Sequence, residues 1–217
     1  MSSHADDGLT TALDLLRSND VLAQNEGVAA AIASGDSAVP ALLSLLDDAN
    51  AGRRAQAMYA LARIGAHEAA TAFQRGLDDA DERVRAYAAL GLVRINHPDA
   101  LTAIIRTLND APDQLHLDVT PAVGVLSELG LAAVSPLLDA LLSEDQLTRL
   151  RAQRALEGIT NRRHGFATGQ GFPTPEAEAA ARAEWRANGP YDHAADAATR
   201  AAAVARWRRW LATVDGR

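Results

Sequence analysis

The sequence lacks cysteine and lysine, and only 4% of its residues are aromatic. Without cysteine the chain can form no disulfide, no thiolate nucleophile and no cysteine-based zinc site. Hydrophobic residues nevertheless make up 48% of the chain, so alanine and leucine must supply most of the buried surface. Both residues favour helices, whereas a β-sandwich would need more Val, Ile, Thr and Tyr. The composition therefore predicts an all-α fold.

The charge balance is acidic, with a net charge of −7 and all 21 basic residues being arginine. Nucleic-acid binding usually requires basic residues clustered on one face, so the balance argues against a nucleic-acid partner. The first seven residues are polar and acidic, unlike a signal peptide, and no apolar run approaches the roughly 18 residues that span a bilayer. We therefore expect a cytoplasmic protein that does not cross a membrane.

An internal repeat with a shift of 31 residues is the strongest signal in the sequence. The motif Leu-Asp-Asp at residues 46–48 recurs at 77–79, and again as Leu-Asn-Asp at 108–110. Segment 54–64 also aligns with segment 85–95. The identical pairs are Arg54/Arg85, Ala55/Ala86, Ala57/Ala88, Leu61/Leu92, Arg63/Arg94 and Ile64/Ile95. Such self-similarity is typical of repeat architectures.

Each repeat is predicted to be a pair of helices, which we call helix A and helix B. Helix A, as at 39–46, is rich in leucine, and the Asp- and Asn-rich turn after it can cap helix B. Helix B, as at 82–95, has its apolar residues on one stripe at helical spacing. One such hairpin cannot bury both its faces, but stacked hairpins can. The predicted units are 8–35, 36–66, 67–97, 98–131 and 132–160.

This pattern resembles the HEAT-like repeats of bacteria, the type also seen in phycobilisome lyase subunits. The resemblance rests on the Asp-rich turn, a helix-B arginine, and the Ala-Ala, Leu and Ile-Gly that follow it. The arginine is present at Arg54, Arg85 and Arg149, whereas Val119 replaces it in the fourth copy. The resemblance implies an α-α superhelix, here a HEAT-like solenoid of about five helical hairpins spanning residues 8–160.

In such repeats the turn aspartate and the helix-B arginine commonly bridge adjacent units. The resemblance therefore implies that Asp47, Asp78, Arg54 and Arg85 form a structural ladder rather than a functional site. A repeat type of this kind identifies a fold more strongly than a function.

Residues 161–217 are predicted to form a Gly- and Pro-rich loop followed by C-terminal capping helices. Thr174 is a good N-cap and Pro175 a good first residue for a helix that ends near residue 187. The last helix, at about 197–213, carries an apolar stripe made of Val204, Trp207, Trp210 and Leu211. The favoured interpretation is a lid that closes the end of the solenoid. The alternative is that the tryptophans anchor a partner.

The candidate binding site is the concave face that B helices line in HEAT-type stacks. The positions that the core does not use include Thr120, Glu128 and Leu150, and the predicted binding residues are Gln56, Tyr59, Arg63, Tyr87, Leu90, Arg94, Arg151 and Arg154. Tyrosine and arginine are enriched at interface hot spots, so we expect a protein or peptide partner, which could be acidic. The alternative is that the arginines are solvated and the tyrosines only cover neighbouring helices.

We expect no catalytic residue, no metal ligand and no cofactor site. The histidines are scattered, and the single pair His67-Glu68 precedes a helix A. The iron enzymes of the deoxyhypusine hydroxylase class, by contrast, use several His-Glu pairs of HEAT repeats. Gly169-x-Gly171 lacks the remainder of a phosphate loop. The predicted function is a non-catalytic interaction scaffold, and the alternative is a HEAT-type lyase or other enzyme subunit that acts on a bound cofactor or protein.

Overall fold

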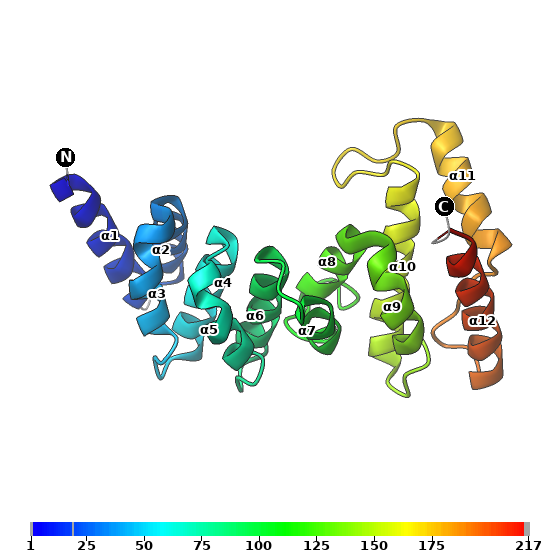
Figure 1. Ribbon diagram of the computed structural model, residues 1–217, viewed down its shortest axis with the longest axis horizontal. Helices are drawn as coiled ribbons and strands as arrows, with labels where there is room; N and C mark the ends of the chain where they lie inside the picture. Colours follow the sequence, from blue (N-terminus) through cyan, green and yellow to red (C-terminus); the bar gives the residue numbers. More distant parts are fainter. Residues whose placement is uncertain (1, 19, 215–217) are drawn as a thin grey trace. The chain divides into compact units, whose positions relative to one another are not determined.

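The computed structural model of the chain describes residues 2–18 and 20–214, with side chains from Gly8 onward in the first helix. The described residues form α-helices and short 3₁₀ helices, and the prediction of an all-α fold is confirmed (Figure 1). The chain divides into two compact units, of which the first ends at Asp110 and the second begins at Ala111. This division falls inside the fourth predicted hairpin, between its helix A and its helix B.

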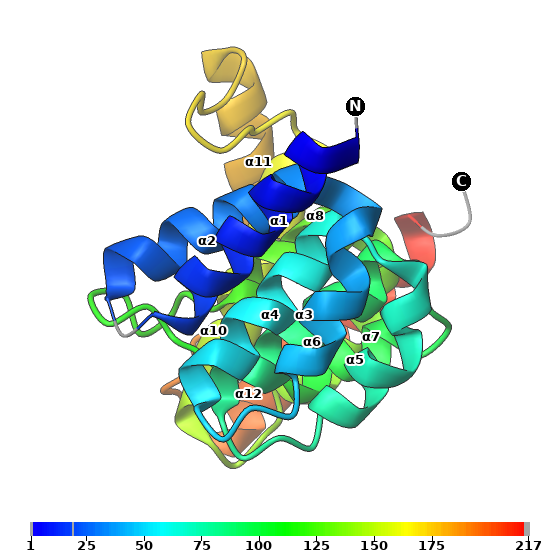
Figure 2. The same ribbon diagram turned by 90° about the vertical axis from the view of Figure 1, so that its left-hand side faces the viewer.

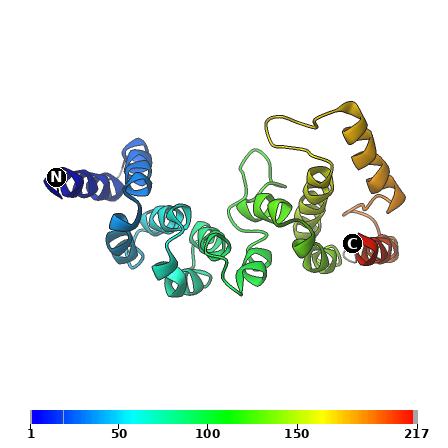
Figure 3. The ribbon, with the colours of Figure 1, turned by 45° about the horizontal axis from the view of Figure 1, so that its top comes forward.

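The first unit contains three complete hairpins and the helix A of a fourth. Its helices are α1 (Ser2–Arg17), α2 (Val21–Ser34), α3 (Val39–Leu45), α4 (Ala51–Ile64), α5 (Ala70–Gly76), α6 (Glu82–Arg94) and α7 (Ala100–Arg106). The B helices pack in sequence, α2 on α4 and α4 on α6, and the A helices α3, α5 and α7 pack beside them. Figure 3 shows these helices of the first unit in two rows. The hairpins are therefore stacked as the repeat predicts.

The second unit contains the end of the repeat region and the C-terminal tail. Its helices are α8 (Pro121–Leu129), α9 (Val134–Ala140), α10 (Gln146–Arg163), α11 (Pro175–Ala187) and α12 (Ala197–Val214). Helix α10 packs against α8, α9 and α11, while α12 packs against α9. The tail helices therefore cover the last hairpin.

Side-chain caps fix where the helices begin. Asn50 accepts hydrogen bonds from the backbone of Gly52 and Arg53 at the start of α4, and Thr174 accepts one from Ala177 at the start of α11. An N-cap of this type satisfies backbone N–H groups that the helix leaves free. The start of α11 was predicted from Thr174 and Pro175 and agrees with the structure, and Asn50 belongs to the Asp- and Asn-rich turn that was predicted to cap helix B.

Two glycines allow helices to approach closely. A Cβ at Gly27 of α2 would lie 2.7 Å from the backbone nitrogen of Leu16, so α1 packs directly on the α2 backbone (Figure 2). A Cβ at Gly91 of α6 would lie 2.3 Å from the ring of Phe73, which is fully buried. At these two positions a side chain would push neighbouring helices apart.

An arginine ladder joins the hairpins of the first unit. Arg54 donates from Nε and Nη2 to the two carboxylate oxygens of Asp79, both at 2.9 Å. Arg85 makes the same two bonds to Asp110, at 2.9 and 2.7 Å. The Nη1 group of each arginine also donates to the turn before its own helix, in Arg54 to the carbonyl of Asp48 at 3.0 Å. Each arginine therefore ties two successive repeats together.

Asp47 and Asp78 also bridge adjacent repeats, as predicted, but they do not pair with Arg54 and Arg85. Their carboxylates instead accept from Arg75 at 3.0 Å and from Arg106 at 2.6 Å, the last-turn arginines of A helices. The difference arises because the second aspartate of each Asp-Asp turn faces the B helices, whereas the first lies one residue earlier and faces the A helices. This second row of ion pairs is exposed.

In the second unit, the C-terminal tail supplies the partner that a further repeat would supply to Arg149. Arg149 donates from Nη1 to the carbonyls of Ser143 and Glu144, both at 2.8 Å, as its counterparts do in their own turns. Its Nε, however, donates to the carbonyl of His193 at 2.8 Å. Trp207 of α12 has no exposed surface. The tail is thus a helical cap on the last hairpin.

Two segments, Val21–Leu45 and Pro121–Ala140, are long and apolar enough to cross a membrane by length and composition alone. The expectation that no apolar run approaches the length needed to span a bilayer is therefore not met by composition alone. Each segment contains a 3₁₀ turn that begins at a glycine with positive φ, Gly35 at 58° and Gly130 at 65°. Each segment is therefore two successive helices of the repeat, not one straight helix.

Candidate functional site

A groove of about 320 Å³ lies on the first unit and is lined only by B helices. Helix α2 contributes four residues, helix α4 contributes four, and helix α6 contributes two. The lining residues are Val21, Gln24, Asn25, Val28, Gly52, Ala55, Gln56, Tyr59, Arg83 and Tyr87. The groove therefore crosses three successive repeats.

Two tyrosines with tilted rings lie side by side in this groove. The ring centroids of Tyr59 and Tyr87 are 5.0 Å apart, with the planes tilted by 56°. Arg63, one turn after Tyr59, donates to its hydroxyl at 2.7 Å and holds its guanidinium 5.6 Å from the ring centroid. Burial raises the pKa of Tyr87, so its hydroxyl stays protonated at neutral pH. The pair is a rigid aromatic surface with a cation at one edge.

Polar side chains of α2 and α4 meet beside the tyrosines. Gln56 donates from Nε2 to Oε1 of Gln24 at 3.0 Å, and Gln24 donates to the carbonyl of Ser18 at 2.7 Å. The Oε1 atom of Gln56 is buried, and no donor among the described residues reaches it. Such an acceptor costs about 1–3 kcal/mol while it stays unsatisfied.

One arginine lines the groove, and two others lie near it on α4 and α6. Arg83 donates to both oxygens of Asp81 at 3.1 and 2.8 Å, and this arginine holds the pKa of the Asp81 carboxyl below its usual range. Arg63 and Arg94 are exposed, and within residues 2–18 and 20–214 neither forms an ion pair with a carboxylate. An acidic protein therefore carries unneutralised arginines near this groove.

The structure brings part of the predicted site together. Gln56, Tyr59 and Tyr87 line the groove, and Arg63 contacts Tyr59. Leu90 and Arg94 follow Tyr87 by three and seven residues, so they continue the same face of α6 beyond the groove. These positions form one surface of the first unit.

The predictions for the second unit need correction. Arg151 is 3% exposed, and its Nε donates to the carbonyl of Leu117 at 2.9 Å, so it is not an outward-facing residue. Arg154 is exposed but donates to Asp118 at 2.6 Å. Both arginines hold the loop before α8 against α10. Thr120, also predicted to face outward, is buried and caps α8.

Sequence reasoning missed the contribution of α2 and of Arg83. The predicted binding residues included none from the first repeat, although Val21, Gln24 and Val28 share one helix face by their spacing. That spacing was the available signal. In the part of the chain that the structure describes, no group of three or more His, Asp and Glu residues could hold a metal ion.

Comparison with protein families gives two matches. The family model for HEAT repeats matches residues 73–157, and the model for the PBS lyase HEAT-like repeat matches residues 53–79. The second match includes Tyr59 of the groove and Arg63, which contacts it. No curated protein matches the sequence with comparable significance.

Three solved structures are similar to this chain over most of its length, at low sequence identity. The complex of CpcE and CpcF of phycocyanin lyase from Nostoc sp. PCC7120 has 22% identity, with 93% of this chain and 98% of that chain covered and a TM-score of 0.41. An engineered protein has 21% identity, coverage of 95% and 97%, and a TM-score of 0.41. A designed armadillo repeat protein has 18% identity, coverage of 92% and 99%, and a TM-score of 0.39.

Proposed function

Because the chain is a HEAT-repeat protein, we propose that it is a non-catalytic interaction scaffold that binds an extended segment of a partner protein in the groove over α2, α4 and α6. Stacked helical repeats commonly bind partners on the surface that successive repeats share. The observation that carries the proposal is the Tyr59–Tyr87 pair, with Arg63 against it, in a groove that crosses three B helices.

The composition of the groove suits a protein ligand. Tyrosine and arginine are the residues that contribute most often to binding hot spots, where truncation costs about 2 kcal/mol or more. Tyr59 and Tyr87 already contact each other, so little side-chain entropy is lost when a ligand covers them. The buried acceptor of Gln56 would gain a hydrogen bond from a partner N–H group after a small rearrangement.

The length of the partner segment follows from the helix spacing. Neighbouring packed helices lie about 8–10 Å apart, so a ligand that crosses from α2 to α6 spans roughly 16–20 Å. An extended chain advances about 3.3–3.6 Å per residue. A segment of about six residues would therefore reach across all three B helices.

The charge of the partner follows from the two arginines that lie beside the groove without a carboxylate partner among the described residues. Arg63 and Arg94 are exposed and can pair with carboxylates through two parallel hydrogen bonds. The partner segment is therefore acidic or amphipathic. Charges on the border of an interface act mainly on the association rate and its salt dependence, so association should slow as salt is added.

A second candidate function is that of an enzyme subunit, such as a HEAT-type lyase subunit that acts on a bound cofactor or protein. The observation that favours it is the match of residues 53–79 to the PBS lyase HEAT-like repeat. The two candidates differ in whether the bound molecule is chemically changed.

The proposal is tested by charge reversal with a matched control. The test variant is Arg63→Glu/Arg94→Glu, and the control is Arg75→Glu/Arg106→Glu, which makes the same charge change on the A helices of the same unit. Because the control also breaks the exposed pairs with Asp47 and Asp78, circular dichroism checks that both variants are folded. Proteins captured from native lysate by each variant are compared by mass spectrometry. We expect the test variant to lose partners that the wild type and the control retain. Equal capture by both variants would place binding on another surface.

A further inference from the structure

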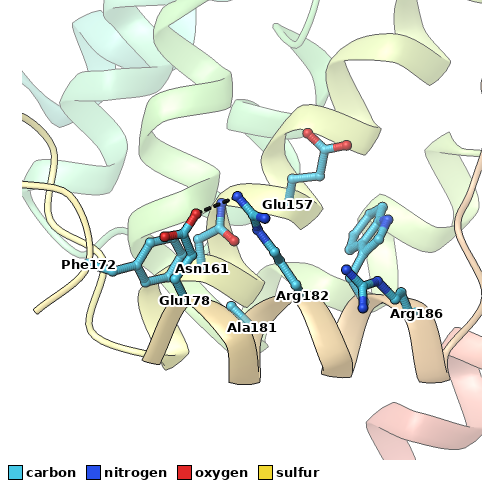
Figure 4. Close-up of a pocket in the computed structure, with 8 residues that line it drawn as sticks. Glu157, Asn161, Phe172, Glu178, Ala181, Arg182 and Arg186 are labelled. Carbon is cyan, nitrogen blue, oxygen red and sulfur yellow. Dashed lines mark hydrogen bonds and ion pairs between the residues drawn. The ribbon is translucent and has the colours of Figure 1, made fainter. Parts of the chain in front are cut away.

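A cleft of about 370 Å³ lies in the second unit between α10 and α11. A second cavity, of about 220 Å³, borders the same two arginines of α11, Arg182 and Arg186. Figure 4 shows Phe172 at one end of the cleft, Arg186 at the other, and Asn161 and Arg182 between them. The cleft is remote in sequence from the groove residues of the first unit and does not depend on the proposed function.

Two aromatic side chains of this cleft are held in fixed positions. The ring of Phe172 lies edge-on to that of Phe166 at 5.2 Å between centroids. Trp185 packs against Trp207 at 4.9 Å, and Trp207 has no exposed surface. Phe172 and Trp185 are themselves half-buried. Because both rings are supported from behind, an apolar or aromatic group can pack on their free surfaces without reorganising the fold.

The carboxylates of the cleft already have donors. Glu178 accepts from Arg182 at 2.5 Å. Glu157 accepts from Gln153 at 2.9 Å and from Arg154 at 3.0 Å. The charge of Glu178 is therefore neutralised within the protein, whereas Glu157 shares the charge of Arg154 with Asp118.

Three donor groups of the cleft remain free. Within the described residues, the guanidinium of Arg186, the side-chain amide of Asn161 and the indole N–H of Trp185 form no hydrogen bond or ion pair. Arg186 can bind a carboxylate through two parallel N–H groups. The cleft therefore combines two supported aromatic surfaces with a cation that lacks a counter-ion.

We propose that this cleft binds an aromatic group that carries a carboxylate, with the ring on Trp185 and the carboxylate on Arg186. A volume of about 370 Å³ is within the usual size range of small-ligand pockets. The same chemistry occurs in a free aromatic acid and in a peptide with an aromatic residue next to an acidic one. The C-terminal cap is thus a binding element as well as a cover for the last hairpin.

Binding is measured on the full chain by titration with three probes. These are N-acetyl-L-phenylalanine, its uncharged carboxamide, and the peptide acetyl-Phe-Glu-amide. The indole N–H signals of the protein are followed by NMR, and the signal of Trp185 is assigned with Trp185→Phe. The indole of Trp210 is the internal control, because it donates to Glu184 at 2.8 Å inside the cap.

We expect the Trp185 signal to shift saturably with a carboxylate-bearing probe, with Kd at or below about 1 mM, while the Trp210 signal stays in place. The carboxamide should bind at least about tenfold more weakly, since it cannot form the charged pair. Saturation by N-acetyl-L-phenylalanine alone identifies a free acid, and saturation by the peptide alone identifies a peptide ligand. If neither shifts Trp185 at about 10 mM, or if the carboxamide binds equally well, the proposal is wrong.

A charge variant tests the role of Arg186. Arg186→Gln should weaken binding of the acid to the level of the carboxamide and leave binding of the carboxamide unchanged, while Arg186→Lys, which keeps the charge, should be intermediate. The control is Arg209→Gln, which removes an exposed arginine of α12 that has no partner among the described residues. Circular dichroism checks that each variant is folded. Equal affinity for the acid in Arg186→Gln and wild type would overturn the assignment.

Discussion

Removing the arginine ladder should destabilise the first unit far more than removing the parallel surface pairs. Arg54 makes two charged hydrogen bonds to Asp79 and a further bond to its own turn. The side chains of Arg54 and Asp79 are each 17% exposed, whereas those of Arg75 and Asp47 are 64% and 74% exposed. The two pairs are alike in charge and differ in burial and geometry.

The magnitude follows from that difference. An exposed ion pair contributes about 0–1 kcal/mol, while breaking a fully buried pair costs about 3–5 kcal/mol because one charge is left without a partner. The Arg54–Asp79 pair lies between these limits. We therefore expect Arg54→Ala to lower the free energy of unfolding by about 2–3 kcal/mol, and Arg75→Ala to lower it by less than about 1 kcal/mol.

Urea unfolding followed by circular dichroism measures both variants against the wild type. The double variant Arg54→Ala/Asp79→Ala should recover part of the loss, because it removes the unpaired carboxylate as well. The reasoning is refuted if Arg54→Ala and Arg75→Ala lower the free energy of unfolding equally. It is also refuted if the loss in the double variant equals the sum of the losses in the single variants Arg54→Ala and Asp79→Ala.

Three further predictions follow from the same contacts. Arg54 lowers the pKa of Asp79, so this pair stabilises the fold above the unfolded pKa of about 3.9. The contribution is lost as pH falls through the lower folded pKa. When pH is lowered below about 4, the free energy of unfolding should therefore decrease less in Arg54→Ala than in wild type. Trp207→Ala should lower the free energy of unfolding, measured by heat or urea, by about 3–5 kcal/mol. Trp207→Phe should lower it by less than about 1.5 kcal/mol, because it keeps an aromatic ring and removes a buried indole N–H that no acceptor among the described residues reaches. Gly91→Ala should lower the melting temperature, since its Cβ would lie 2.3 Å from the phenylalanine ring of α5, whereas Gly124→Ala, which meets nothing within 4 Å, should raise stability by about 0.5–1 kcal/mol; a melting temperature that falls equally in both would contradict this.

Periodicity and capping residues were enough to predict the helices. The start of α11 was predicted at Pro175 because Thr174 and Pro175 form a local signal that no distant contact overrides. The repeat likewise predicted the stacked hairpins, since a shift of 31 residues places equivalent apolar stripes next to one another.

The side-chain pairs that join neighbouring repeats could not be predicted as well as the helices. Which aspartate of an Asp-Asp turn meets Arg54 depends on the direction in which the turn points its side chains, and the sequence does not specify this. Arg151 was assigned to the surface by its helical position, but the loop before α8 folds over it and buries it. That loop conformation depends on contacts that are distant along the chain.

The candidate site was predicted in part for the same reason. Tyr59 and Tyr87 were found because they lie at or near equivalent positions of two clear repeats. The side chains of α2 were missed because the first repeat departs from the pattern, although the structure places them in the same groove.

The central claim, that the groove over α2, α4 and α6 binds a partner segment, is tested most directly by site-specific photo-crosslinking. A photoreactive amino acid at Asn25, an exposed residue that lines the groove, is compared with one at Thr102, an exposed residue of α7. The account predicts that Asn25 crosslinks to an acidic segment of a partner, that Arg63→Glu/Arg94→Glu abolishes this product, and that Thr102 does not form it. Crosslinking of the same partner from Thr102 but not from Asn25 would contradict the account.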